Sequence, residues 1–470
     1  MIFRIENVGP LHDAEVDLSK RLIVLTGPNN TGKTYLAWSV YGLYVFRTRA
    51  GSALIDRCVD SLLTSTRNEV DLGELMEQHY QELLSSFATA YTSSIHLCFA
   101  AEQGRFDGVS VALHGTDATE SLAKLRLGKY LTGLGRFEQP IGFAALDLRR
   151  GLVRLILWNT DKPPTVPVGD MYNAMTAADQ ALLKSRLGTA ILNIIYSAMF
   201  KRCEIFPAER IAVNIFAKEL AAKRSELVDE LVDADIEGHQ MVPMDVIRRN
   251  TGRYPWPIRD SLRTANDLTR LSKEHSPFED LASELETSVL GGKVELSSDG
   301  EISYTPHDAP ERSLGVHLTA SVVKSLSSLV FYFRHLARAN DFIVIDEPEL
   351  NLHPDSQRKL ARILAKAVRR GFKLMMSTHS DYIIRELNHM IMLSKLSPEA
   401  ARELGYDPEC ALAPDDVGVY LFNDHTATLV PVTETGFSIQ TIDDQINALN
   451  ADAQRLYARI FDDEAAAAAQ

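Results

Sequence analysis

Short apolar runs that end abruptly in polar residues are the most regular pattern in this chain. Residues 22–25, 342–345 and 372–376 are short and largely apolar, and each is followed by small or charged residues. Such runs are too short for a helix but typical of strands that are buried on both faces. Upstream of them, Ile2 to Leu18 alternate apolar and polar residues around Gly9-Pro10, which predicts a two-stranded hairpin.

Longer segments with a helical period separate these runs. The sequence therefore predicts an α/β fold, in which a mixed sheet flanked by helices is interrupted by a large, mainly helical insertion. Helices are expected at 35–45, 71–88, 177–200, 216–235, 256–275, 317–335, 357–370, 381–396 and 442–461. Further strands or hairpins are expected at 95–100, 109–113, 153–158, 292–305 and 417–432.

The positions of these elements predict how the chain is divided. We expect an N-terminal lobe of the core at 1–50, the insertion at 51–200 and a short return to the core at 201–215. A helical arm would follow at 216–290, then a C-terminal lobe of the core at 291–430 and a final helix and tail at 431–470.

A glycine-bounded loop follows the first apolar run and reads GPNNTGKT, from Gly27 to Thr34. Strand, loop, Lys-Thr and helix form the context that a phosphate loop requires, in which backbone N–H groups face the phosphates. Lys33 would reach the β- and γ-phosphates, and Thr34 would place its hydroxyl on Mg²⁺. The loop residues expected to contact the nucleotide are Gly27, Asn29, Asn30, Thr31, Gly32, Lys33 and Thr34.

Two adjacent carboxylates, Asp346 and Glu347, end the second run, and STHS with His379 ends the third. Asp346 is placed to hold Mg²⁺, Glu347 to orient a water for attack on a γ-phosphate, and His379 to bond that phosphate. An acidic turn and a structural histidine are the simpler alternatives. Three strand tips that point to one place favour a common ATP and Mg²⁺ site.

Two further candidates lie near helix and strand ends. Arg210, in FPAER, follows a short strand and is a candidate nucleotide-site residue, although such a charged residue is usually part of a structural ion pair. Thr319 and Ser321 lie at the expected start of the 317–335 helix. Their hydroxyls either cap this helix or present an anion site to a nucleotide held by a second copy of the chain.

In their order along the chain, GPNNTGKT, LTASVVKSL, IDEPELNLHP and STHS resemble the ATP-binding-cassette type of P-loop ATPase. The closest branch is similar to the RecF/SMC and overcoming-lysogenization-defect ATPases and their relatives in bacterial anti-phage systems. The resemblance implies the roles given above for Lys33, Asp346, Glu347 and His379. It also implies that LTASV stands where the family has its signature sequence.

This chain departs from the family pattern in two places. Ala320 and Ser321 stand where the signature glycines would be, which affects how closely the site could contact a partner's nucleotide. The segment after residue 396 lacks the separated acidic motifs of a Toprim nuclease, so no Toprim domain is expected.

Arg270 and His275 have the spacing of a HEPN ribonuclease motif, without the polar residue that usually adjoins the arginine.

Charge and composition narrow the class of partner. The net charge of −14 does not support a general attraction to nucleic acid or anionic lipid, although the helix at 357–370 is basic. No run of eighteen apolar residues and no signal peptide is found, so we expect a cytoplasmic protein without a membrane span. Four scattered cysteines have no metal or redox spacing.

The sequence therefore predicts an ATPase that binds ATP and Mg²⁺ and assembles at least as a homodimer through its ATP sites. The resemblance implies a regulatory subunit of a bacterial anti-phage defence system that controls a separately encoded effector such as a nuclease. Two alternatives remain open. One is a RecF-like DNA-repair ATPase that uses the basic helix, and the other is a self-contained ATP-gated toxin that uses Arg270 and His275.

Overall fold

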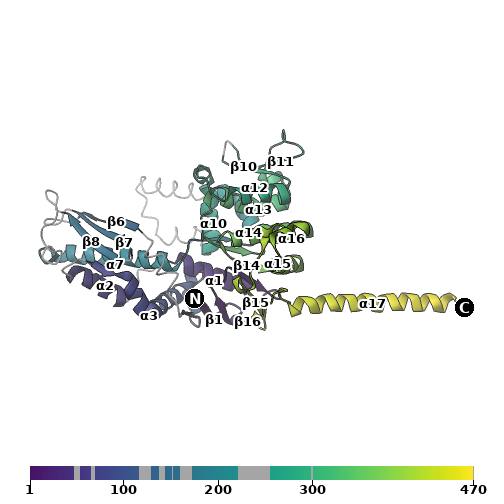
Figure 1. Cartoon of the computed structure of the whole chain (residues 1–470), viewed down its shortest axis with the longest axis horizontal. Coiled ribbons are helices and arrows are strands. Elements are labelled where there is room, and N and C mark those ends of the chain that lie inside the picture. Colours follow the sequence, from purple (N-terminus) through teal and green to yellow (C-terminus); the bar gives the residue numbers. More distant parts are fainter. Residues whose placement is uncertain are drawn as a thin grey trace, which may run out of the picture. The chain divides into compact units, whose positions relative to one another are not determined.

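A computed structural model of the chain describes residues 1–46, 53–64, 69–115, 129–136, 143–150, 152–158, 172–220, 254–297 and 300–468 (Figure 1). They form two compact units. The first unit holds residues 1–5, 42–95 and 109–202. The second unit holds residues 6–41, 96–108 and 203–470.

The three apolar runs form neighbouring parallel strands at the centre of the second unit. They are β3 (Leu22–Thr26), β14 (Lys373–Thr378) and β13 (Phe342–Asp346), and every residue in them is buried. The sheet order in this unit is β2-β16-β15-β3-β14-β13-β9. Apart from the antiparallel pair β15–β16, the pairings recorded in this order are parallel, so the sheet is mixed as expected. The outer strands are β2 (Leu11–Asp17), β16 (Thr426–Val430), β15 (Val417–Asn423) and β9 (Cys203–Phe206).

Helices with one apolar face cover this sheet. Their buried residues and those of the strands form a single large core. Helix α14, for example, buries Leu360 and Leu364, together with the charged side chain of Lys366. The helices and remaining strands of the second unit are α10 (Trp256–Asn266), α11 (Leu268–Leu271), α12 (Glu279–Leu285), β10 (Gly292–Leu296), β11 (Ile302–Pro306), β12 (Leu314–Gly315), α13 (Ser321–Phe331), α14 (Pro354–Arg369), α15 (Asp381–Leu393), α16 (Pro398–Glu403) and α17 (Gln440–Ala468).

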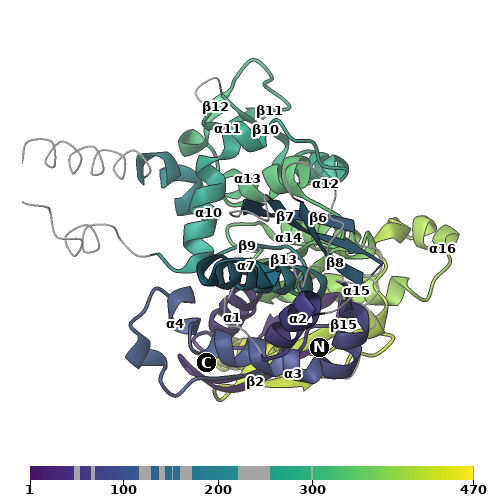
Figure 2. The same cartoon turned by 90° about the vertical axis from the view of Figure 1, so that its left-hand side faces the viewer.

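The first unit combines helices with a sheet of its own (Figures 1 and 2). Helix α2 (Ala53–Thr64) packs on α7 (Ala177–Met199), and α7 and α3 (Leu72–Thr92) contact the sheet. Asp71 caps the start of α3 and Thr176 that of α7, as their side-chain oxygens favour. The sheet order is β4-β8-β7-β6, with β4 (Glu69–Asp71), β8 (Leu152–Trp158), β7 (Phe143–Arg149) and β6 (Lys129–Arg136); β5 (Ser110–His114) also belongs to this unit.

Two elements, β1 (Ile2–Val8) and α1 (Lys33–Val45), have residues in both units. Strand β1 forms the predicted hairpin with β2 across Gly9-Pro10. Helix α1 follows the predicted phosphate loop. The P-loop ATPase type of fold expected from the sequence is therefore present: a mixed sheet, flanking helices and a large inserted segment.

Some predicted elements differ from the structure. Residues 95–100 were expected as a strand but begin with a short helix, α4 (Ile95–Cys98). Tertiary contacts explain the difference, because Phe99 stacks on Tyr35 and the Cys98 thiol donates to the Trp38 carbonyl. Residues 221–235 of one expected helix, and Asp299 of the expected hairpin turn, lie outside the described residues.

Candidate nucleotide site at the strand tips

The carboxyl ends of the three central strands meet at one edge of the sheet. In the parallel register, Asp346 lies opposite Ser377, and Thr378 lies opposite Thr26. The phosphate loop, the carboxylate pair and His379 therefore leave the sheet side by side. Open α/β sheets bind ligands at this edge.

The phosphate loop is curled in a way that only glycine allows at two positions. Gly27 has a φ of +133°, and a Cβ there would strike the Phe422 carbonyl oxygen. Gly32 has a φ of +102°, and its Cβ would lie 2.9 Å from Cβ of Leu11. Asn29 and Asn30 are exposed, while the Thr31 hydroxyl donates to the Pro28 carbonyl at 2.8 Å and holds the turn closed.

Lys33 is buried beneath this loop, where its ammonium donates to the Gly27 and Pro28 carbonyls at 3.1 and 2.6 Å. Burial lowers the pKa of Lys33 to about 8, and nearby Glu347 and Asp346 oppose that change. A lysine so placed gains most from an anionic ligand, since phosphate oxygens would replace lost hydration. Thr34, the next residue, is half-buried.

Asp346 is buried and has one carboxylate oxygen without a protein partner. Its Oδ1 accepts a hydrogen bond from Ser377 Oγ, whereas Oδ2 is buried with no hydrogen-bond partner among the described residues. An unpartnered buried carboxylate oxygen is costly unless a cation or donor meets it. The donor set therefore fits Mg²⁺, which Asp346 and the Thr34 hydroxyl would hold and which, when bound, would neutralise phosphate charge.

Glu347 is held in an unusual backbone conformation at the tip of β13. Its φ is +49°, and its N–H donates to the carbonyl and hydroxyl oxygens of Ser377 at 3.2 and 3.0 Å. Burial, and then the charge of Asp346, raise the pKa of Glu347, which suits a group that orients water. The strained conformation is typical of a functional position.

His379 lies beside Glu347, with Nε2 3.8 Å from Glu347 Oε1. Burial, together with the charge of Lys33, lowers the pKa of His379 and keeps the ring neutral at pH 7. A neutral imidazole can donate from one nitrogen and accept at the other. Its distance from Glu347 and the influence of Lys33 on its pKa put His379 beside the other three predicted residues.

Glu349 also belongs to this site, although the sequence did not single it out. Its Oε1 accepts hydrogen bonds from Thr378 Oγ1 at 2.9 Å and from the His379 backbone N–H at 2.6 Å, while Oε2 is buried without a partner among the described residues. Burial raises the pKa of Glu349. Glu349 thus fixes the tip of β14 relative to the carboxylate loop. A third carboxylate in DEPEL was the available sequence signal.

Arg210 lies behind the carboxylate pair. Its guanidinium donates to the backbone carbonyls of Asp346 and Glu347 at 2.7 and 2.8 Å, and to the carbonyl and hydroxyl of Ser325 at 3.1 and 3.0 Å. Burial lowers the pKa of Arg210 to about 10, against the raising effect of the carboxylates, so it remains charged. These bonds make it a positioning residue that ties α13 to the carboxylate loop.

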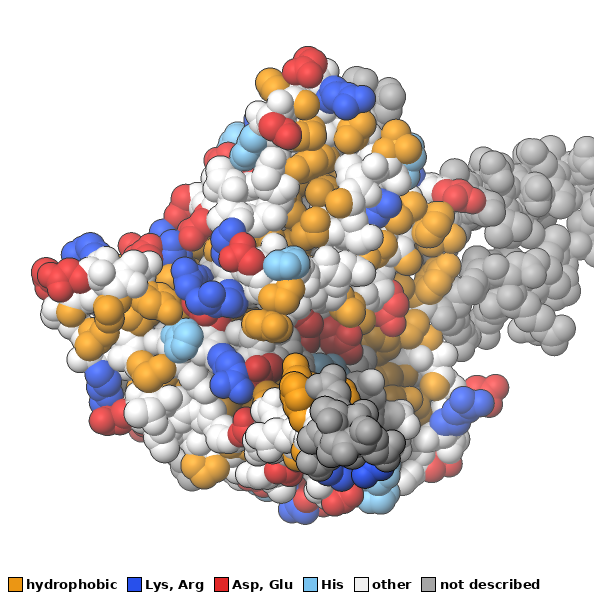
Figure 3. Space-filling view, turned by 90° about the vertical axis from the view of Figure 1, so that its right-hand side faces the viewer, with side chains coloured by type: hydrophobic (Ala, Val, Ile, Leu, Met, Phe, Trp, Pro, Cys, Tyr) orange, Lys and Arg blue, Asp and Glu red, His pale blue; other side chains and the backbone are white. Residues whose placement is uncertain are grey.

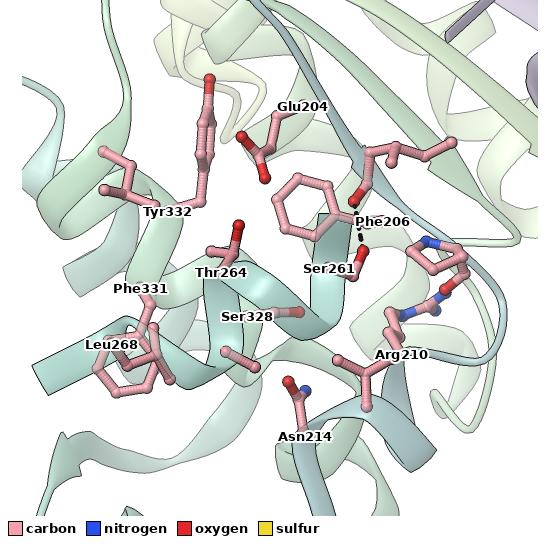
Figure 4. Close-up of a pocket in the computed structure, with 15 residues that line it drawn as sticks. Glu204, Phe206, Arg210, Asn214, Ser261, Thr264, Leu268, Ser328, Phe331 and Tyr332 are labelled. Carbon is pink, nitrogen blue, oxygen red and sulfur yellow. Dashed lines mark hydrogen bonds between the residues drawn. The ribbon is translucent and has the colours of Figure 1, made fainter. Parts of the chain in front are cut away.

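A small apolar cavity adjoins Arg210 (Figure 4). Phe206, Phe331 and Leu268 contribute to its lining, and Ser261 donates to the Ile205 carbonyl at 3.3 Å along its wall. None of the four strand-tip residues lines it. The cavity is therefore separate from the predicted triphosphate site.

The start of α13 differs from the capped helix that the sequence predicted. The helix begins at Ser321 rather than at residue 317, and its N-cap is Ala320, which offers no side-chain oxygen. Thr319 is buried and donates its hydroxyl to the Val316 carbonyl at 2.7 Å. Capping by Thr319 is therefore wrong, and the first N–H groups of α13 have no side-chain cap. Ser321 is exposed beside them.

The basic helix α14 uses its cations within the fold. Arg358 and Arg362 bond the two oxygens of buried Glu386 at 2.7 and 2.6 Å, and Lys366 bonds Glu284 and Asp407, each at 2.8 Å. Lys359 and Arg370 also form ion pairs. Figure 3 likewise shows basic and acidic side chains interspersed on one face of the molecule.

The ribonuclease-like pair has no comparable organisation. Arg270 is exposed and bonds Asp267 at 3.0 Å on the same short turn of helix. His275 lies with its ring centroid 6.4 Å from that of His335. These contacts are those of ordinary surface residues, and they do not indicate a catalytic pair.

A phosphate loop, a buried lysine and carboxylates at adjoining strand tips define the fold and site of a P-loop ATPase. Residues 175–384 match a family described as an AAA ATPase domain. The matched segment includes Arg210, the carboxylate pair and His379, and it leaves out the phosphate loop. The fold and this match together support ATP hydrolysis at a general level.

Among solved structures, the chain is similar to the SMC head domain from Thermotoga maritima, with 11% identity, a TM-score of 0.30, and coverage of 92% of this chain and 98% of that one. It is also similar to the Smc head domain with an extended coiled coil bound to the C-terminal domain of ScpA, from Pyrococcus furiosus. Identity there is 11%, the TM-score is 0.33, and coverage is 96% and 98%.

No curated protein matches the chain. Among the described helices, none combines the length and the apolar character that crossing a bilayer requires.

Proposed function

We propose that the protein hydrolyses ATP·Mg²⁺ at the strand tips through in-line attack of a water that Glu347 orients. Lys33 would bind the β- and γ-phosphates, Asp346 and Thr34 would hold the metal, and His379 would donate a hydrogen bond to the γ-phosphate. The observation that carries this assignment is the buried, unpartnered Oδ2 of Asp346 beside a buried lysine. A purely structural carboxylate would have both oxygens hydrogen-bonded within the described residues.

The hydrolysis step is tested with Glu347→Gln, which keeps the shape of the side chain and removes its charge. We expect ATP to bind and remain trapped, with turnover reduced by about 10²-fold or more. Single-turnover hydrolysis and retained nucleotide measure both effects. Turnover at the wild-type rate in this variant would reject the role of Glu347.

We further propose that two copies associate head to tail, each binding the other's nucleotide with the start of α13. The start of α13, which no side chain among the described residues caps, and the exposed Ser321 hydroxyl support this proposal, because an uncapped helix N-terminus favours an anion. Replacing Ser321 with Glu would place a negative charge at that end. It should prevent ATP-dependent dimerisation of the trapped variant while leaving ATP binding to each copy intact.

As its biological role, we propose the regulatory ATPase of a bacterial anti-phage defence system that acts on a separately encoded effector, such as a nuclease. Motif order supports this role through the resemblance given above. Co-expression with the adjacent genes, followed by phage challenge, tests it: protection should require both the partner gene and an intact Glu347. Protection by this chain alone would instead favour a self-contained toxin.

DNA repair is the competing role, and the ion pairs of α14 argue against it. A helix that binds DNA needs cations that are free to contact its phosphates, because these contacts release the counterions held by the DNA. Most cations of α14 are already bonded to carboxylates. Salt-dependent DNA binding that stimulates hydrolysis would overturn this preference.

A further inference from the structure

Helix α17 is the longest helix within the described residues, and most of it lies on no other element. Near its start, Ile442 packs against the core of the second unit. From Asn447 to Phe461 every residue is exposed, and no other labelled element runs along this stretch (Figure 1). A long helix gains little from propensity alone and usually depends on packing of an apolar face.

That face is present, and no other described element covers it. Leu449, Leu456 and Ile460 are 71%, 66% and 54% exposed, although such side chains are normally buried. Tyr457 and Phe461 stack beside them, with ring centroids 6.2 Å apart. An apolar stripe of this extent on one helix marks an interaction surface.

The spacing of the stripe identifies the geometry of its partner. Its apolar positions alternate intervals of four and three residues, a period of 3.5, along the series Ile442, Ile446, Leu449, Ala453, Leu456 and Ile460. A seam at these positions suits a second helix wound around the first, and Tyr457 and Phe461 lie beside it.

A membrane surface does not fit this helix. Helices that lie on anionic lipid carry Lys and Arg along their polar face. Here the polar positions carry Asp443, Asp444 and Asp452 against Arg455 and Arg459, so this helix is not predominantly basic, and the whole chain has a net charge of −14. The partner is therefore a protein helix.

We propose that α17 pairs with α17 of a second copy of this chain in a parallel, two-stranded coiled coil that forms without nucleotide. In heptad terms, Ile446, Ala453 and Ile460 occupy a positions, and Leu449 and Leu456 occupy d positions. Isoleucine at the two outer a positions with leucine at both d positions favours a parallel dimer, and Ala453 fills the middle a position. In a parallel pair each a or d residue contacts the same residue of the second copy, so the seam is self-complementary.

The flanking charges are compatible with this pairing. Asp452 lies beside the seam and already accepts a hydrogen bond at 2.5 Å from Arg455, one turn along the same helix. Its charge is therefore partly balanced before a second copy approaches. The pairing uses neither Lys33 nor α13, so it is independent of the proposed ATP-dependent contact.

The first test measures the mass of the full chain without nucleotide, by sedimentation between about 1 and 100 µM. We expect a dimer that Leu449→Asp with Leu456→Asp converts to monomer. The matched control, Ala451→Asp with Ala458→Asp, adds the same charge on the opposite face and should remain dimeric. A wild-type monomer over this range, or equal masses for both double variants, would overturn the proposal.

The second test fixes the orientation by cysteine cross-linking, with the wild-type chain as background for its native thiols. Leu449→Cys and, separately, Ala453→Cys should each form a disulfide-linked dimer, because equivalent core positions adjoin in a parallel pair. Ala451→Cys, on the outer face, should not. Cross-linking of Asn450→Cys in preference to these core positions would indicate an antiparallel pair and overturn the arrangement.

Discussion

Helix α14 and the strand-tip edge both concentrate charged side chains, but they differ in whether those charges have partners. Arg358 and Arg362 of α14 both bond buried Glu386 of α15, and Lys366 of α14 is bonded by two carboxylates. At the strand tips, Asp346 and Glu349 each keep a buried oxygen without a partner among the described residues. In this molecule, paired charges therefore indicate a structural role, and a buried carboxylate oxygen without a partner indicates a ligand site.

Replacing Asp346 with Asn gives the sharpest contrast. We expect hydrolysis to fall by about 10²-fold or more, because the metal loses its carboxylate. The nucleotide-free protein should become more stable by about 1 kcal/mol, since a buried like-charged neighbour of Glu347 is removed. ATPase assays and urea unfolding measure the two changes. A variant that is both inactive and less stable would show that Asp346 is a structural charge.

The opposite outcome is expected at Glu386. Changing it to Ala should lower the free energy of unfolding by about 2 kcal/mol, because Arg358 and Arg362 lose their shared carboxylate. ATP binding should be unaffected. The exposed pair of Arg402 and Glu399, 4.0 Å apart, provides the control, and Glu399→Ala should cost below about 0.5 kcal/mol. Equal losses for the two variants would contradict the assignment of Glu386 as a structural anchor.

Nucleotide affinity should depend on pH above 8. Lys33 has a pKa lowered to about 8, so it is mostly protonated below that pH and mostly neutral above it. A triphosphate favours the charged form, so binding at higher pH requires proton uptake, and Kd should rise up to about tenfold per pH unit. Titration calorimetry on Glu347→Gln at pH 7, 8 and 9 measures this, and because the charge of Glu347 raises the pKa of Lys33, its loss moves the rise in Kd to lower pH.

The control for that experiment adds Lys33→Arg, whose guanidinium does not titrate in this range. If this variant still binds, its affinity should not change between pH 8 and 9. An unchanging Kd in the parent variant over the same interval would show that Lys33 remains charged before nucleotide binds.

The smallest effect is expected for Lys359 on α14. Lys359 forms an exposed pair with Asp355 at 2.6 Å, and its replacement by Gln should change stability by at most about 0.5 kcal/mol. ATPase activity with and without DNA should also be unchanged. A clear loss of DNA-stimulated activity would restore the basic helix as a nucleic-acid surface.

Local pattern predicted most of the core. The apolar runs of β3 and β13 specified buried strands, and the Gly27–Thr34 motif specified the loop between strand and helix. Their meeting at one edge followed from parallel pairing. Helix and strand periods also predicted α3, α7, α14 and the β10–β11 hairpin.

Features that depend on distant contacts were not predictable in this way. Glu349 gains its role from Thr378, which ends β14, and from His379, which follows it. Arg210 shows the same limit, since its partners on α13 and β13 are remote in sequence. Strand β6 was missed because Gly133 and Gly135 interrupt its pattern, and the register shifts between them.

The bonds of Arg210 have a mechanical consequence. One guanidinium bonds the α13 backbone at Ser325 and the carbonyls of both carboxylate residues. Helix α13 cannot slide without breaking these bonds or dragging the reactive carboxylates out of alignment. A substitution that weakens the packing of α13 should therefore lower the rate of hydrolysis while nucleotide still binds. The position of this one helix thus controls the alignment of the reactive carboxylates.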